Sequence, residues 1–190
     1  MPRFFVEPAL WGGDTVTLSG DTHRHISLSL RMAVGESVIL SNGEGEEADG
    51  RILSMSATET VLALSAPRAG EAELPVSVRL YQGNPKGDKL DLIVQKATEL
   101  GADAIIPFES SRCVVHTRPE RAEKQTSRLL RIAAEAAAQC GRARIPTVCL
   151  PLSYAAALAD AKRTADIILF CYEEERTSSL GPIASTVRKG

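Results

Sequence analysis

A change in hydrophobic periodicity near residue 75 divides this sequence into two parts of different construction. Up to about residue 66, short runs of apolar and β-branched residues alternate with turns rich in glycine, asparagine and aspartate, as in β-hairpins. The runs are residues 3–6, 15–18, 25–30, 37–40, 51–55 and 60–64. So short a segment is too small for a β-sandwich but large enough for a small barrel. We therefore predict an all-β domain over residues 1–70 and a linker over residues 71–75.

Residues 76–190 alternate strands with helices. The predicted strands are residues 76–81, 104–108, 145–150 and 167–172, and the predicted helices are residues 89–100, 119–140 and 154–162. Asp88 and Gly101 are suited to cap the first helix, and Gly141 is suited to end the second. This alternation predicts a parallel sheet with helices on its faces, which binds ligands at the carboxyl ends of its strands. Because the most hydrophobic strand, residues 167–172, needs neighbours on both sides, we expect the chain to be truncated within this domain.

The net charge of −2 hides an asymmetry between the two parts. Residues 1–75 contain 5 lysines and arginines against 11 acidic residues, whereas residues 76–190 contain 17 against 13. Since lysine and arginine supply most of the nonspecific affinity for phosphate, a polyanion is expected to bind the second part.

Several kinds of protein are disfavoured by what the sequence lacks. It has no run of 18 apolar residues, and an acidic residue and a proline follow the amino terminus too soon for a signal peptide, which favours a cytoplasmic protein. The four cysteines match neither a zinc pair nor a disulfide framework, and His23 and His25 lack a third ligand at diagnostic spacing, so no metal is predicted. No P-loop or dinucleotide-binding glycine motif occurs.

The long predicted helix carries a polar, largely basic stripe. With Arg131 at 0° and about 100° per residue, the other members lie within about 80° of it. They are Arg128, Glu135, Gln139 and, if the helix continues that far, Arg142. The spacing alone also fits a solvated face with an Arg131–Glu135 pair, worth only a few tenths of a kcal/mol. Both interpretations remain open at this point.

A second group of cations lies near the start of the parallel sheet. Lys86, Lys89 and Lys96 surround the first helix of this part, where they could bind phosphate or could cover the edge of the core with their alkyl stems. Arg112 follows the predicted strand 104–108, where α/β sheets bind their ligands.

Thirteen short blocks of the sequence resemble, in order and spacing, the ribosomal RNA small subunit methyltransferase E family. The blocks are Pro2–Phe5, His25–Ile26, Leu30–Met32, Gly35–Glu36, Asn42–Gly43, Lys86–Lys89, Gln95–Gly101, Pro107, Ser111–Arg112, Arg131–Ile132, Glu135–Ala136, Gln139–Arg142 and Ile145–Pro146. The resemblance spans essentially the whole chain. It implies methylation of N3 of a uridine in 16S ribosomal RNA of the small subunit, with S-adenosyl-L-methionine as cofactor.

The resemblance also implies a fold and an assembly. Its fold is a PUA-like β-barrel that helps to hold RNA, followed by an α/β domain of the SPOUT type with a trefoil knot. The knotted domains would join two copies as a homodimer. The family's glycine-rich GPEGG loop and its later LG-x-x-x-LR-x-ET segment do not occur in these 190 residues. We therefore expect the knot to be incomplete, and this chain to bind the cofactor weakly and to be inactive.

Site residues follow from the stripe and the resemblance together. Arg131 and Glu135 are the candidate catalytic residues. The candidate RNA-binding residues are Arg3, Arg31, Lys86, Lys89, Lys96, Arg112, Arg128, Gln139 and Arg142. Phe170, Tyr172 and Glu173 are the candidate cofactor-binding residues. Two other functions stay open, an RNA-binding module without catalysis and a metabolic α/β enzyme with a small β appendage, although the absence of nucleotide motifs disfavours the second.

Overall fold

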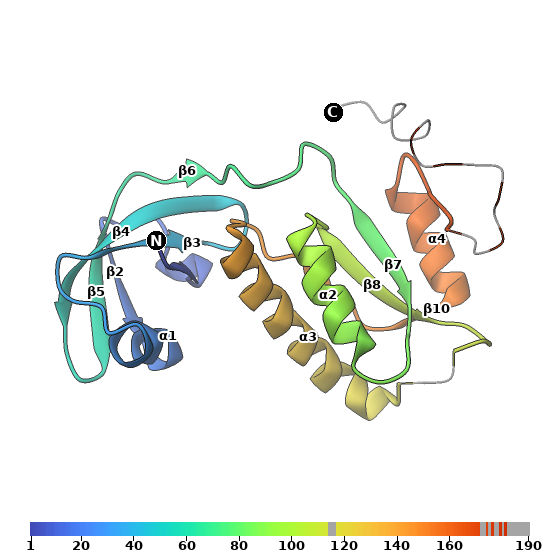
Figure 1. Cartoon of the computed structure of the whole chain (residues 1–190), viewed down its shortest axis with the longest axis horizontal. Helices are drawn as coiled ribbons and strands as arrows, with labels where there is room; N and C mark the ends of the chain where they lie inside the picture. Colours follow the sequence, from blue (N-terminus) through green and yellow to red (C-terminus); the bar gives the residue numbers. More distant parts are fainter. Residues whose placement is uncertain (114–116, 172–173, 175, 177–178, 180, 182–190) are drawn as a thin grey trace.

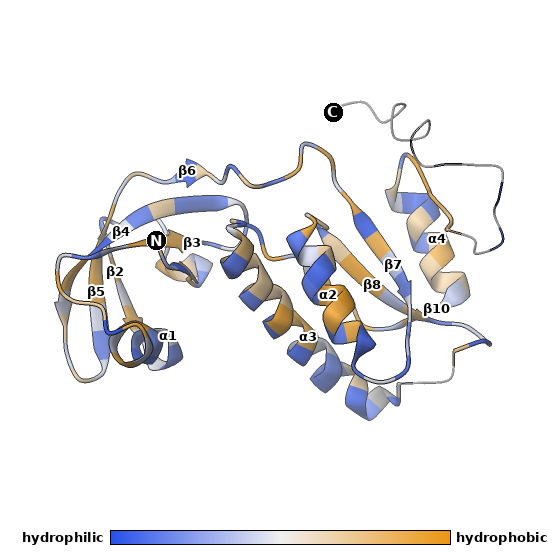
Figure 2. Cartoon of the chain, in the orientation of Figure 1, coloured by the Kyte–Doolittle hydropathy of each residue, from blue (hydrophilic) through white to orange (hydrophobic). Residues whose placement is uncertain are grey.

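The computed structural model describes residues 1–113, 117–171, 174, 176, 179 and 181 of the chain. Figure 1 shows two lobes, a curled β-sheet lobe that contains the amino terminus and an α/β lobe. Buried hydrophobic residues form a separate cluster in each lobe, so each has a core of its own. Figure 2 shows hydrophobic stretches along the strands and helices of both lobes. No helix among the described residues is long and apolar enough to cross a membrane.

The first lobe is a six-stranded sheet with the order β1-β3-β4-β5-β2, in which β6 pairs with β4. The strands are β1 (Arg3–Phe5), β2 (Thr15–Ser19), β3 (Ser37–Ser41), β4 (Glu46–Met55), β5 (Glu59–Leu64) and β6 (Arg68–Ala69), and a 3-10 turn, η1, covers Pro8–Leu10. All pairs are antiparallel except that of β1 with β3. Alternation along β2 buries Val16 and Leu18, which pack with Leu40, Ile52 and Leu62 in the core. The prediction that the first part is a domain built on a β-sheet is therefore confirmed, although one segment of it is helical.

The strand predicted at residues 25–30 is wrong. The chain there forms a helix, α1 (Gly20–Arg24), that continues directly into a π-helical turn, η2 (His25–Ser29). Apolar residues alternate along this segment, but only Ile26 enters the core, whereas Leu28 and Leu30 are 69% and 41% exposed. The alternation therefore did not reflect a buried strand face.

The second lobe contains the predicted parallel sheet. Its strands are β7 (Arg79–Gly83), β8 (Ala104–Glu109), β9 (Thr147–Val148) and β10 (Leu152–Ser153), and its helices are α2 (Lys89–Glu99), α3 (Pro119–Cys140) and α4 (Tyr154–Thr164). The central strand, β8, pairs in parallel with β7 on one side and with β9 and β10 on the other. Leu90, Ile105, Leu129 and Val148 share one core, so α2 and α3 cover the same face of the sheet.

Two predicted strands of this lobe differ from the structure. Residues 145–150 supply only the short β9, and β10 follows after Pro151, because proline has no N–H to give to a sheet ladder. The described part of the strand predicted at 167–172, residues 167–171, is neither strand nor helix. Ile167, Ile168 and Leu169 are 44–49% exposed and Phe170 is 71% exposed. Among the described residues no strand pairs with this segment, so its hydrophobicity alone does not order it as a strand.

A buried arginine joins the linker to the second lobe. The Arg142 side chain is 2% exposed, and its Nε and Nη2 donate to Glu73 Oε2 at 3.1 and 2.7 Å. Its Nη1 donates to the carbonyl oxygens of Thr98 and Ala102 at 3.1 and 2.7 Å. Glu73 Oε1 in turn accepts the backbone N–H groups of Ala143 and Arg144, both at 3.0 Å. We call this arrangement of Glu73 and Arg142 the linker clasp.

The turn between β3 and β4 packs against the same segment of the second lobe. Ser41 Oγ and the Gly45 N–H donate to the Ala143 carbonyl at 2.8 and 3.2 Å, and the Ile145 N–H donates to the Gly43 carbonyl at 3.0 Å. Gly43 has φ of 76°, a left-handed conformation that favours glycine. The linker clasp and this turn together fix the two lobes against each other.

A carboxylate on α4 attaches that helix to β7. Asp160 Oδ2 accepts the Tyr81 hydroxyl at 2.7 Å and Arg79 Nη2 at 3.1 Å. Tyr81 lies on the opposite side of β7 from Leu80, which packs with α2 and α3, so α4 covers the other face of the sheet.

Asp160 should make the stability of this attachment depend on pH. The Tyr81 hydroxyl, and after it the Arg79 guanidinium, hold the pKa of Asp160 below its ordinary value. A lowered pKa in the folded state gives stability that is present above the unfolded value of about 3.9 and is lost as pH falls through the folded value. We expect Tyr81→Phe to raise the pKa of Asp160 in an NMR titration, because the first of its donors is removed. Tyr154→Phe, on the same helix, is the control and should leave it unchanged; a Tyr81→Phe titration like that of the wild type would contradict the assignment.

Candidate functional site

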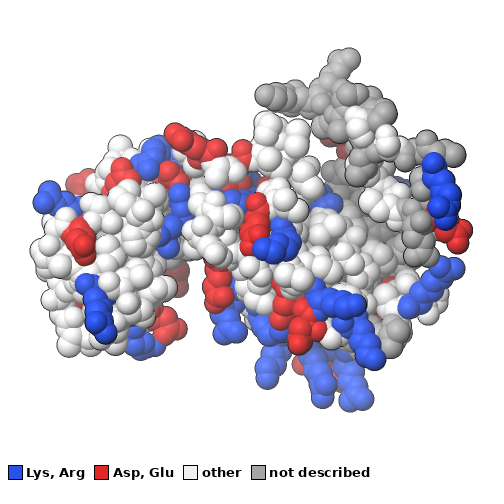
Figure 3. Space-filling model, viewed as in Figure 1, with Lys and Arg blue, Asp and Glu red and all other residues white. Residues whose placement is uncertain are grey.

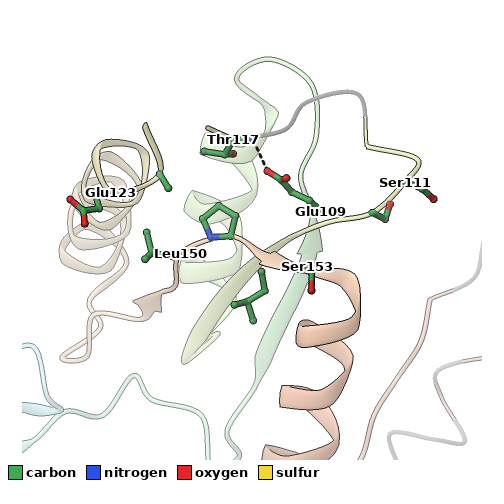
Figure 4. Close-up of a pocket in the computed structure, with 10 residues that line it drawn as sticks. Glu109, Ser111, Thr117, Glu123, Leu150 and Ser153 are labelled. Carbon is green, nitrogen blue, oxygen red and sulfur yellow. Dashed lines mark hydrogen bonds between the residues drawn. The ribbon is translucent and has the colours of Figure 1, made fainter. Parts of the chain in front are cut away.

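The carboxyl ends of β8 and β10 border a cavity of about 570 Å³. Figure 4 shows that its walls come from the ends of these strands, from the loop after β8 and from the start of α3. It is lined by Glu109, Ser110, Ser111, Thr117, Ala122, Glu123, Leu150, Pro151, Leu152 and Ser153. Its position agrees with the expectation that the parallel sheet binds ligands at the carboxyl ends of its strands.

Hydrogen bonds hold the loop around this cavity. Glu109 Oε1 accepts the Thr117 N–H at 2.6 Å (Figure 4). The Thr117 hydroxyl accepts Asn84 Nδ2 at 3.1 Å and donates to Gln125 Oε1 at 3.2 Å. Because Asn84 follows β7 and Gln125 belongs to α3, one threonine connects three segments around the cavity.

The thiol of Cys113 lies in the same loop. Its sulfur accepts the Ser110 N–H at 3.4 Å, and this backbone hydrogen bond lowers the pKa of the Cys113 thiol from its ordinary value. The bond closes the turn after β8 and so shapes the part of the loop that carries Ser110, Ser111 and Arg112.

A second cavity, of about 440 Å³, lies between α2 and α3. Its lining is Asp88, Asp91, Leu92, Gln95, Ile132, Glu135, Ala136 and Gln139. It brings together Glu135 and Gln139, two members of the predicted stripe, with amide and carboxylate groups of α2. The Arg128 guanidinium forms an ion pair with Asp91 at this groove.

The predicted catalytic pair is a surface pair. Arg131 Nε lies 4.0 Å from Glu135 Oε1, and both side chains are 73% exposed. Glu135 lines the α2–α3 groove, and neither residue lines the cavity at the carboxyl ends of the strands.

The predicted RNA-binding residues fall into separate places. Lys86, Lys89 and Arg112 are exposed on the loops that follow β7 and β8 or at the first turn of α2, close to the strand ends. Lys96 is exposed on α2, where it donates to Glu99 at 2.7 Å and lowers the pKa of that carboxyl. Arg31 is exposed on the other lobe.

Two of these predictions are corrected by the structure. Arg142 cannot contact RNA because its guanidinium is buried and bonded within the linker clasp. The helical wheel failed there because α3 ends at Cys140 and Gly141 turns the chain with φ of 85°. The Arg3 side chain is only 9% exposed and pairs with Glu47 at 2.7 Å, so it holds β1 to its neighbours instead.

The predicted cofactor residues are not gathered at the cavity. Phe170 does not line it, and Tyr172 and Glu173 lie outside the described residues. Sequence reasoning missed Glu109, Leu150 and Leu152 as lining residues. Their place at or just beyond the carboxyl ends of predicted parallel strands was the signal that could have found them.

The chain is similar to RNA methyltransferases along its length. A sequence model described as an RNA methyltransferase domain matches residues 72–188, and one described as an RNA methyltransferase PUA domain matches residues 18–61. A ribosomal RNA small subunit methyltransferase E of Bacillus subtilis is 34% identical over 100% of this chain and 77% of its own length. One from Mycobacterium bovis is 29% identical over 76% of this chain and 55% of its own.

Solved structures agree with the sequence comparisons. A ribosomal RNA small subunit methyltransferase E from Neisseria gonorrhoeae, bound to S-adenosyl methionine, has a TM-score of 0.74 at 33% identity over 83% of this chain and 65% of that one. A putative methyltransferase from Legionella pneumophila, also in complex with this cofactor, has a TM-score of 0.72 at 28% identity over 86% of this chain and 66% of that one.

Proposed function

This chain belongs to the ribosomal RNA small subunit methyltransferase E family, and on that premise we propose that the protein transfers a methyl group from S-adenosylmethionine to N3 of a uridine in 16S ribosomal RNA. The observation that carries the proposal is the 34% identity with the Bacillus subtilis relative over the whole chain. The first lobe is a PUA-like domain and the second has the SPOUT methyltransferase fold. We further propose a trefoil knot, a homodimer formed through the knotted domains, and a cytoplasmic location.

The cavity at the carboxyl ends of β8 and β10 fits S-adenosylmethionine in size and chemistry. About 570 Å³ lies within the usual range of small-molecule sites. Leu150 and Leu152 offer apolar surface to the purine ring, and the hydroxyls of Ser110 and Ser153 can bond to the ribose. The Glu109 carboxylate suits a cofactor that carries positive charge. When bound, the cofactor supplies an electrophilic methyl group on a sulfonium. Contacts between the cofactor and Phe170, Tyr172 and Glu173 remain a prediction.

The protein itself must hold the target base in place and promote the loss of its imide proton. N3 lies on the pairing edge of uracil, so the uridine must be unpaired or flipped out of a helix to react. It must also lose its imide proton, and negative charge then develops on the uracil oxygens. Cations at the strand ends, such as Lys86 and Arg112, are placed to bind the RNA backbone and to stabilise this charge. Orienting the base against the methyl group can lower the barrier by several kcal/mol.

The proposal is tested with the full-length gene product and small ribosomal subunits from a strain that lacks its own methyltransferase E. We expect labelled methyl groups to pass from S-adenosylmethionine to one uridine, and mass mapping of the ribosomal RNA to place them on N3. The Bacillus subtilis relative is the positive control. Methylation of a different base or atom would contradict the proposal. RNA binding without any transfer would instead favour an RNA-binding module.

Arg131 and Glu135 remain the candidate catalytic residues, and single substitutions test them. If the pair orients the RNA or its proton acceptor, Arg131→Ala and Glu135→Ala should each lower kcat/KM about tenfold, which corresponds to about 1.4 kcal/mol of transition-state stabilisation. The matched control is Lys162→Ala on α4, whose exposed side chain lies on the other face of the sheet. Wild-type rates from both variants would remove this pair from the mechanism.

A further inference from the structure

Cations without an acidic partner are concentrated at one end of the second lobe. Elsewhere in the described part of the chain, most arginines form ion pairs, as Arg68 does with Glu47 and Asp49 and Arg163 does with Asp160. Among the residues that directly precede or begin α2 and α3, five exposed cations have no carboxylate within ion-pair distance in the described part of the chain. They are Lys86, Lys89, Arg118, Arg121 and Lys124. We call them the strand-end cations.

These residues come from two segments that the structure ties together. Lys86 and Lys89 precede and begin α2, whereas Arg118, Arg121 and Lys124 precede and begin α3. The hydrogen bond from Asn84 Nδ2 to the Thr117 hydroxyl, 3.1 Å long, joins the two segments just upstream of the cations. Figure 3 shows lysine and arginine side chains gathered along the lower edge of the second lobe, over this end of α2 and α3.

Arg118, Arg121 and Lys124 were not part of the predicted stripe, but the two on α3, Arg121 and Lys124, extend it. On a helix with about 100° per residue, Arg121 and Lys124 fall in the same arc of about 80° as Arg128 and Arg131. Arg128 pairs with Asp91, and Arg131 lies 4.0 Å from Glu135, so the unpaired charge of the stripe is at its amino-terminal end. That end carries the positive pole of the α3 macrodipole as well.

The same residues adjoin the candidate cofactor cavity. Ala122 and Glu123 line the cavity and lie in the sequence between Arg121 and Lys124, and Thr117 lines it next to Arg118. This end of α3 therefore contributes both to the wall of the cavity and to the group of cations.

We propose that Arg118, Arg121 and Lys124, with Lys86 and Lys89, form a phosphate-binding surface that holds the RNA strand on either side of the target base. The inference rests on the proposed function, because it takes RNA as the polyanion. The five unpaired cations outnumber the exposed carboxylates of the same segments, Asp88, Glu120 and Glu123. The excess of positive charge attracts a phosphate backbone, and each contact releases counterions that had condensed on the RNA. The acidic balance of residues 1–75 leaves the second lobe as the source of this attraction.

The salt dependence of RNA binding tests the surface. We would measure the affinity of the full-length protein for fluorescent 16S ribosomal RNA fragments between low and moderate salt. Each phosphate contact contributes about 0.7 to the slope of log K against log salt for a single strand. The double variant Arg121→Gln, Lys124→Gln should therefore reduce the slope by about 1.4, and should weaken binding at physiological salt about tenfold.

A charge-matched variant on another helix provides the control. Lys162→Gln, Arg163→Gln removes one lysine and one arginine from exposed positions of α4 and should keep the wild-type slope. Equal slopes for the two double variants would overturn the inference and leave the proposed function standing. A reduced slope for Arg121→Gln, Lys124→Gln in a protein that binds RNA but never methylates it would support the surface and reject the proposed activity.

Discussion

Arg142→Ala is expected to destabilise the protein by about 3 kcal/mol in urea unfolding, a large part of the 5–15 kcal/mol that holds a typical domain folded. The substitution leaves Glu73 without its guanidinium partner, and it removes the donor from the carbonyl oxygens of Thr98 and Ala102. Groups that are buried and lose their hydrogen-bond partner carry the full cost of desolvation.

Comparison with another arginine separates this effect from loss of charge alone. Arg131→Ala removes an arginine that is 73% exposed and 4.0 Å from its partner, so it should change the free energy of unfolding by less than about 0.5 kcal/mol. The double variant Arg142→Met, Glu73→Gln should recover part of the loss, because the Glu73 carboxylate is then no longer left without its cation. A loss below about 1 kcal/mol for Arg142→Ala would show that the linker clasp does not stabilise the fold.

Gly70→Ala should disrupt the contact between the lobes while leaving both cores intact. A Cβ at Gly70 would lie 2.3 Å from the Cβ of Ala143, which is far inside van der Waals contact. Ala143 cannot move away, because it is fully buried and its N–H donates to Glu73 while its carbonyl accepts the Ser41 hydroxyl. Overpacking of this kind costs about 1–3 kcal/mol.

The single tryptophan allows the unfolding of the first lobe to be followed separately from that of the second. Trp11 packs against the core of the first lobe, so its fluorescence follows that lobe, whereas far-UV circular dichroism is dominated by the long helices of the second. We expect the two transitions to coincide in the wild type and to separate in Gly70→Ala. Gly13→Ala is the control, since its Cβ would approach only the backbone of Thr15, at 3.5 Å. Coincident, unshifted transitions in Gly70→Ala would show that the lobes do not depend on this contact.

Prediction from the sequence is most accurate where the hydrophobic periodicity and the residues at the ends of an element indicate the same structure. The bounds of α3 were as expected because Pro119 opens the helix and Gly141, with positive φ, closes it. Prediction fails at residues 25–30 and 167–171, where an apolar pattern favours a strand but no strand of the described part of the chain pairs with it. Sheet pairing depends on distant segments, and a local pattern does not report them.

The position of the candidate site could be predicted from the sequence, but the residues that form it could not. The parallel sheet predicted a ligand site at the strand ends, and the cavity lies there. The role of Arg142 could not be read from the sequence because its partner, Glu73, is 69 residues away and belongs to a linker. The sequence does not distinguish Arg121 and Lys124 from Arg128 and Arg163. Only the structure shows that Arg128 and Arg163 form ion pairs, whereas Arg121 and Lys124 form none with the described residues.

The linker clasp and the β3–β4 turn have a consequence for the choice of substrate. The Ala143 N–H donates to Glu73, and its carbonyl accepts the Ser41 hydroxyl and the Gly45 N–H. These bonds hold the PUA-like lobe and the strand-end cavity at a fixed distance from each other. Under the proposed function, this fixed distance would favour an RNA whose target uridine lies at a matching distance from a second feature of its folded shape. Under the proposed function, free RNA lacking that shape would be a poor substrate even if it carried the correct nucleotide sequence.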